Sequence, residues 1–71
     1  MEYLDKYDML KKIITEEMEI DGKMYTLEEE FDKFFVKGNK TAGRRIRKFM
    51  QMIRRSAEDI RQDVQAYKRT I

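Results

Sequence analysis

The sequence predicts an all-α fold, a small helical bundle with a long, coiled-coil-like carboxy-terminal helix, assembled as a homo-oligomer. Two compositional features support this class, since the 71 residues contain no proline and 42% of them are charged. Such a composition is typical of long, solvated helices. Apolar residues also recur at spacings of three and four through most of the chain. We therefore expect residues 1–71 to form one domain.

The first segment has the pattern of an amphipathic helix from about Tyr3 to Ile20. Its apolar face would contain residues three or four apart and be widened by their neighbours. The spaced residues are Tyr3, Tyr7, Leu10, Ile14 and Met18, and the neighbours are Met9, Ile13 and Ile20. Asp21-Gly22 would end the helix, because glycine readily adopts a left-handed backbone. A short hairpin of residues 18–20 and 23–25 around Asp-Gly is the alternative. Strands of three residues are short, so a helix followed by a turn is favoured.

A second helix is predicted from about Leu27 to Lys37, with an apolar stripe of Leu27, Phe31 and Phe34 or Phe35. Thr26 precedes Glu29 by three residues, which is the capping-box pattern of a helix start. Gly38 and Asn39 then interrupt the helix, since both tolerate positive φ. Asn39 or Thr41 is expected to cap the helix that follows.

The last segment has a heptad pattern that begins at Gly43 and continues to Ile71 without interruption. Ile46 takes position d and Met50 position a, and a 3.5-residue period of this length is typical of a coiled-coil seam. One chain has too few apolar residues to cover both sides of such a helix, so we expect a homo-oligomer, most simply a dimer. The predicted oligomer seam consists of Ile46, Met50, Ile53, Ala57, Ile60, Val64 and Tyr67.

Charge divides the chain into an acidic helical front half, residues 1–36, and a basic half with the long helix, residues 37–71. The front half has five lysines and eleven acidic residues, a net charge of −6. The second half has eleven cations and three acidic residues, a net charge of +8. This asymmetry predicts an anionic partner for the basic half. Mutual neutralisation of the two halves, within one chain or between chains, is the alternative.

The cations of the basic half follow one side of the predicted long helix. Heptad positions e and f carry seven of them over about 30 Å, at 1.5 Å per residue. Arginine predominates, and its planar guanidinium suits phosphate oxygens. The e-position arginines could instead pair with glutamates of a neighbouring helix. The predicted phosphate-binding residues are Lys37, Lys40, Arg44, Arg45, Arg47, Lys48, Arg54, Arg55, Arg61 and Lys68.

The residue types present argue against catalysis. The chain has no histidine or cysteine, which excludes His-based acid–base chemistry and zinc sites that need these ligands. The carboxylate runs do not converge on one helix face, and Gly38–Gly43 does not form a phosphate-binding loop because Arg44 follows. We expect no enzyme activity, metal, cofactor or small-molecule substrate. No apolar run is long enough to span a membrane, and the first residues do not resemble a signal peptide.

Residues 37–48, Lys-Gly-Asn-Lys-Thr-Ala-Gly-Arg-Arg-Ile-Arg-Lys, resemble the signature of the chlamydial-type linker-histone-like proteins of bacteria and some phages. Nine of the twelve positions agree with the pattern K-G-N-K-A-A-G-T-R-A-R-K, and Thr41, Arg44 and Ile46 depart from it. The resemblance implies a helical, self-associating protein that binds DNA with little sequence preference. The resemblance implies DNA contacts by Lys37, Lys40, Arg45, Arg47 and Lys48, and structural roles for Gly38, Asn39 and Gly43. The Lys/Ala/Pro-rich tail of the chlamydial members is absent.

Together these observations predict a nucleoid-associated, histone-like protein of the cytoplasm, encoded by a bacterium or a phage. Its expected ligand is double-stranded DNA, bound through phosphates, with RNA left open. The main alternative is a coiled-coil protein-interaction module with complementary acidic and basic faces. Peripheral binding to an anionic membrane is a third possibility, which the strict heptad pattern and the absence of tryptophan disfavour.

Overall fold

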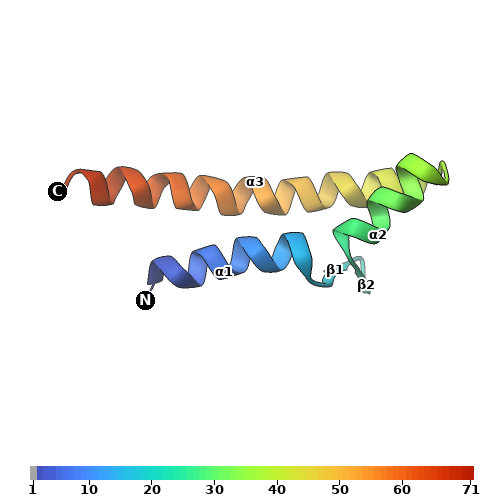
Figure 1. Cartoon of the computed structure of the whole chain (residues 1–71), viewed down its shortest axis with the longest axis horizontal. Helices are drawn as coiled ribbons and strands as arrows, with labels where there is room; N and C mark the ends of the chain where they lie inside the picture. The colour runs from blue at the N-terminus through green and yellow to red at the C-terminus, as the bar shows by residue number, and fades with distance from the viewer. Residues whose placement is uncertain (1) are drawn as a thin grey trace.

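The protein is an elongated helical hairpin with a small β-hairpin inserted at one end (Figure 1). The computed structural model describes residues 2–71, with side chains from Leu4 onward, and measures 49 × 19 × 17 Å. Helix α1 (Glu2–Thr15) lies along the carboxy-terminal helix α3 (Lys40–Lys68) and runs antiparallel to it. The predicted packing of two shorter helices against one long helix is confirmed, although the fold also contains a two-stranded sheet.

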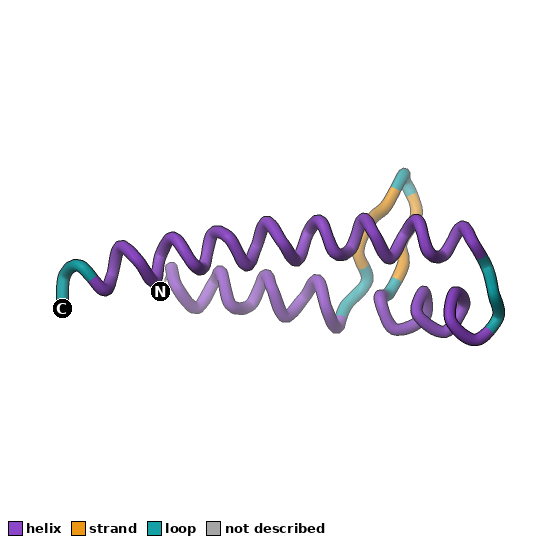
Figure 2. Tube along the Cα trace, turned by 90° about the horizontal axis from the view of Figure 1, so that it is seen from above, coloured by secondary structure: helices purple, strands orange, loops and turns teal. Residues whose placement is uncertain are grey.

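The prediction that the first helix continues to Ile20 is wrong. Helix α1 ends at Thr15, and strands β1 (Met18–Ile20) and β2 (Lys23–Tyr25) form the antiparallel hairpin that was the alternative. Asp21 and Gly22 have φ values of 53° and 85°, and two central residues with positive φ match the twist of a tight hairpin. The hairpin crosses α3, so that its tip and the following helix emerge on opposite sides of α3 (Figure 2).

Helix α2 (Leu27–Phe31) starts as the capping box predicts, because the Thr26 hydroxyl accepts a hydrogen bond from the Glu29 amide at 3.3 Å. The helix does not stay α-helical, however. Its last part is a π-helical turn, η1 (Asp32–Val36), in which the Lys37 amide donates to the Asp32 carbonyl at 3.2 Å. Gly38, with φ of 71°, then reverses the chain.

The start of α3 agrees with the predicted cap. The Asn39 side-chain oxygen accepts hydrogen bonds from the amides of Thr41 and Ala42, at 3.0 and 3.3 Å. Gly43 permits a close approach of η1, since a Cβ at this position would lie 2.6 Å from the Phe34 ring. The helix therefore begins at a defined residue and is anchored against the preceding turn.

The core lies where α1, the hairpin, α2 and the first half of α3 meet. Its buried members are Ile13, Ile20, Leu27 and Phe49, and Phe49 has no exposed surface. The predicted apolar face of α1 is confirmed in part, because Leu10 and Ile13 face inward, whereas Tyr7, Met9 and Ile14 are exposed. The side chain of Tyr3 lies outside the described residues.

Helix α1 packs on the flank of α3 that contains Phe49, Ser56 and Asp63, which is centred on heptad position g. The Lys6 ammonium lies 2.7 Å from the Asp63 carboxylate on this flank. Four residues of the predicted seam are half-buried, and Met50, Val64 and Tyr67 are exposed. The half-buried members are Ile46, Ile53, Ala57 and Ile60. Their role in an oligomer stays a prediction.

Candidate nucleic-acid interface

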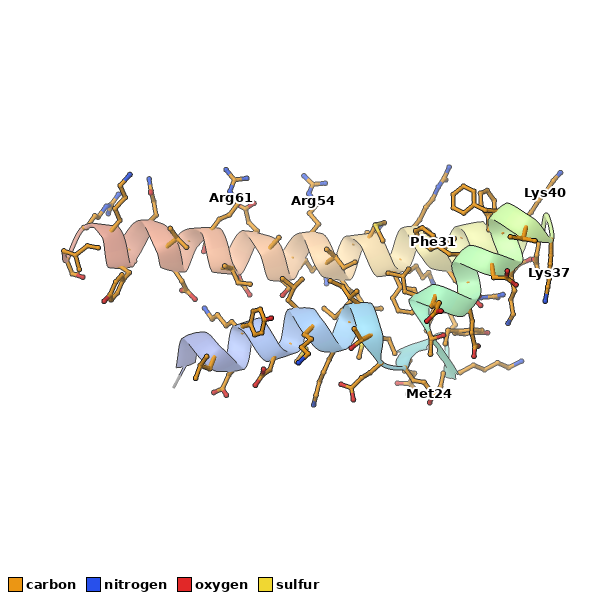
Figure 3. The ribbon with its side chains drawn as sticks, in the orientation of Figure 1. Met24, Phe31, Lys37, Lys40, Arg54 and Arg61 are labelled. Carbon is orange, nitrogen blue, oxygen red and sulfur yellow. The ribbon has the colours of Figure 1, made fainter. Side chains whose placement is uncertain are left out.

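Helix α3 presents a row of cations on the side opposite α1. Arg47, Arg54, Arg61 and Lys68 repeat every seven residues, about 10.5 Å apart along the helix. Figure 3 shows Arg54 and Arg61 pointing away from α1. This direction follows from the helix period, because position e lies about 160° from the g flank that α1 covers.

The cations on this side have few acidic neighbours. Within the described part of the chain, no carboxylate lies within 4.0 Å of Arg44, Arg47, Arg54 or Arg55. The nearest acidic contact is Glu58, whose carboxylate lies 4.0 Å from the Arg61 guanidinium, with both side chains mostly exposed. Surface pairs of this kind are worth little, so Arg61 stays available to another anion.

We call this surface the outer basic face. It is formed by exposed residues of α3 that are directed away from the core or lie at the edge of that side: Lys40, Arg44, Arg47, Arg54, Arg55, Arg61 and Lys68.

Arg45 has a different environment from its neighbours on α3. Its guanidinium forms an ion pair with the fully buried carboxylate of Glu30 on α2, and its side chain is only 16% exposed. The same guanidinium lies 4.4 Å from the centre of the Tyr25 ring on β2, a cation–π contact. The Lys33 ammonium approaches the second oxygen of Glu30 at 3.3 Å. Arg45 thus joins α2 and the hairpin to α3.

Lys48 and Lys37 are also held by acidic residues. The Lys48 ammonium lies 2.7 Å from the Asp21 carboxylate at the tip of the β-hairpin. The Lys37 ammonium lies 3.6 Å from Asp32, one turn earlier in η1. Of the ten predicted phosphate-binding residues, the structure therefore places seven on the outer basic face and gives Arg45, Lys48 and Lys37 partners within the chain.

Two features next to these cations were not recognised in the sequence. One is the Asp21–Lys48 pair, which depends on the hairpin. The other is an exposed aromatic cluster of Phe31, Phe34 and Phe35 in α2 and η1. The three phenylalanines within five residues were a visible signal, but the predicted stripe was interpreted only as a core-facing surface.

The far end of α3 has an apolar groove of about 470 Å³ beside the start of α1. Ile60, Val64, Tyr67 and Ile71 line it, with the charged groups of Lys6, Asp63 and Lys68 at its edges. Among residues 2–71, no helix is both long and apolar enough to cross a lipid bilayer. The described residues also contain no group of three or more His, Cys, Asp or Glu side chains placed to hold a metal ion.

Comparisons with known proteins identify the family of the chain. Neither the curated proteins nor the solved structures contain a significant match to this chain. The family model described as "Histone H1-like protein Hc1" matches residues 15–70, which include the hairpin, α2, η1 and all of α3. The match covers 56 of 71 residues, so the chain belongs to the histone H1-like protein Hc1 family.

Proposed function

We propose that the protein binds double-stranded DNA without sequence preference and organises it as a nucleoid-associated, histone-like protein. The observation that carries this proposal is the outer basic face, where four arginines have no acidic partner in the described chain. Membership of a family named for its likeness to histone H1 supports the same function.

The chemistry of the face suits a phosphate backbone. Lys40 and Lys68 are the ends of a helix about 42 Å long, and its arginines offer planar forks that pair with phosphate oxygens. Contacts of this kind position a protein on a duplex but carry no sequence information. RNA presents the same phosphate chemistry. Competition with unlabelled RNA measures which of the two nucleic acids the protein prefers.

The internal ion pairs refine the set of DNA contacts. Arg45 would have to leave a buried carboxylate in order to reach a phosphate, which is costly. We therefore assign Arg45 to holding the fold together. Lys48 and Lys37 are exposed enough to leave the carboxylates of Asp21 and Asp32 and bind a phosphate. We therefore assign them secondary contacts at the edge of the outer basic face.

The exposed part of the predicted seam supports assembly of two chains. Val64 and Tyr67 are 59% and 53% exposed, and both line the apolar groove at the far end of α3. An apolar end of this kind gains free energy when a second chain covers it. A dimer would present two outer basic faces and could bridge two DNA segments.

A protein-interaction module is the second candidate, favoured by the same apolar groove. It predicts that the e-position arginines pair with acids of a neighbouring helix. Within the described chain, four acids pair with Arg45, Lys48, Lys37 and Lys6, and Glu58 lies 4.0 Å from the e-position Arg61. Arg47 and Arg54 have no such partner there. Arg47 and Arg54 are therefore left for an anion outside the chain, and the titration below distinguishes a nucleic acid from the acids of a second chain.

Fluorescence anisotropy with a labelled random-sequence duplex tests the proposal. The seven cations of the outer basic face predict that log affinity falls with log salt at a slope of about −6. Unlabelled duplexes of different sequence should compete equally. Absence of binding at low salt, or a slope near zero, would contradict the proposal and favour the interaction module.

A further inference from the structure

An exposed aromatic cluster occupies the end of the molecule where α3 begins. The rings of Phe34 and Phe35 are 4.8 Å apart, edge to face, and those of Phe31 and Phe35 are 5.4 Å apart. Phe35 and Val36 are the most exposed members, at 68% and 75%. We call Phe31, Phe34, Phe35 and Val36 the aromatic edge. Contiguous apolar surface of this kind marks a site of contact.

The aromatic edge adjoins the outer basic face. The Phe34 ring lies directly on Gly43 of α3, where no Cβ could be accommodated without a shift. Lys40 and Arg47 precede and follow Gly43 by three and four residues, so they share its side of the helix. The ring is therefore flanked by two cations, and neither has a carboxylate within 4.0 Å in the described chain.

The local backbone keeps the edge at the surface. Gly43 lets η1 approach α3 closely, and the π-turn ends at Val36, just before the chain reverses at Gly38. Phe34 thus contributes the contact with α3, whereas Phe35 and Val36 project from the end of the turn. The cluster is anchored on one side and open on the other.

The surrounding charges decide which partner fits. A two-fold contact centred on this surface would bring Lys40, Arg44 and Arg47 of both chains close together, and Asp32, the acidic residue of η1, is already paired with Lys37. That arrangement repels. A nucleic acid instead offers phosphates to the cations and aromatic bases to the phenylalanines. Apolar wedges flanked by basic residues open base steps in this way in several DNA-bending proteins.

We propose that Phe35 and Val36 insert against a base step of duplex DNA whose phosphates lie on the outer basic face, and that they unstack and kink this step. This inference rests on the proposed DNA binding. It adds a base-contacting site, independent of sequence, to a surface that otherwise contacts phosphates alone. Each molecule would then bend the duplex at the end where α3 begins.

The test uses the full chain and a short DNA duplex with two probes. One 2-aminopurine base reports unstacking, because its fluorescence rises when it is unstacked. A donor–acceptor dye pair at the two ends reports bending through the efficiency of energy transfer. Wild-type protein should raise the 2-aminopurine signal and the transfer efficiency. Phe35→Ala should lose most of both signals and bind about three- to tenfold more weakly, with an unchanged salt slope. Val36→Ser, at a more exposed position, should reduce both signals in part without affecting the fold.

Tyr7→Ala is the matched control, because Tyr7 is an exposed aromatic residue, 58% accessible, on α1. It should leave both signals unchanged. Unchanged signals in Phe35→Ala and Val36→Ser, or no signal from a wild-type protein that binds, would overturn the inference and leave DNA binding intact. No binding at all would overturn the proposed function itself. Loss of self-association in Phe35→Ala, seen by sedimentation without a change in base stacking, would assign the edge to a second copy.

Discussion

The two sides of α3 use the same residue types for different purposes. On the inner side, Arg45 lies against Glu30 and Tyr25, and Phe49 fills the core. On the outer side, Arg54 points away from α1 (Figure 3), and neither Arg47 nor Arg54 has an acidic neighbour in the described chain. Arg44 and Arg45 are adjacent in the sequence, yet only Arg45 is engaged. The difference shows that the basic signature contains both a residue held against the core and residues exposed to solvent, and that helix geometry decides which is which.

The largest expected effect on stability comes from removing the Phe49 ring on the inner side of α3. Phe49→Ala removes a ring with no exposed surface, and we expect a loss of about 4 kcal/mol in the free energy of unfolding. A domain of this size has about that much stability, so the variant should be largely unfolded at 25 °C. Met50→Ala, next in sequence but 41% exposed, should lose less than about 1 kcal/mol. Urea titration followed by circular dichroism measures both, and equal losses would contradict the assigned sides.

The next effect concerns the buried ion pair. Arg45→Met leaves the Glu30 carboxylate buried without its guanidinium, which should cost about 3 kcal/mol. The double variant Arg45→Met/Glu30→Met also removes the buried carboxylate and should regain most of the lost stability. Arg54→Met, on the outer side, should change the unfolding free energy by less than about 0.5 kcal/mol. Thermal unfolding of the wild type, the two single variants and the double variant measures these stability changes. An Arg45→Met variant as stable as the wild type would show that Arg45 does not support the fold.

The smallest effect concerns the hairpin tip. Asp21→Asn removes the acidic partner of Lys48, and asparagine tolerates the φ of 53° at this position. The free energy of unfolding should therefore change by less than about 0.5 kcal/mol. Released Lys48 should steepen the salt slope of DNA binding by up to about 0.9 and tighten binding a few-fold. Glu19→Gln removes an equal charge from the same hairpin without freeing Lys48. Equal changes in the two variants would mean that only the net charge matters.

The sequence predicted the features that depend on neighbouring residues. The Thr26 and Asn39 caps and the long helix are set by local hydrogen bonds and by a period that continues for eight turns. The sequence favours a helix followed by a turn over the β-hairpin, because strands of three residues are short. The Asp-Gly pair decides otherwise, since both residues adopt positive φ and close a two-residue turn that buries Ile20.

The features that depend on packing could not be predicted. Glu30 and Arg45 are 15 residues apart, and only the docking of α2 on α3 brings them together. The heptad correctly indicated a long helix with an apolar side, but it could not show that the covered flank is centred near position g. This flank half-buries Ile53 and Ile60 and leaves Val64 exposed. The same limit applies to the cations, because their spacing alone did not separate Arg45 from Arg44.

The outer basic face is tested most directly by removing its charges and repeating the salt titration. Arg47→Gln/Arg54→Gln/Arg61→Gln should make the slope of log affinity against log salt shallower by about 2.7, at 0.9 for each phosphate, with unfolding unchanged. Lys11→Gln/Lys12→Gln/Lys23→Gln removes three exposed cations from α1 and β2, and its slope should stay within about 0.5 of the wild-type value. Equal slopes for wild type and the arginine variant would contradict the account.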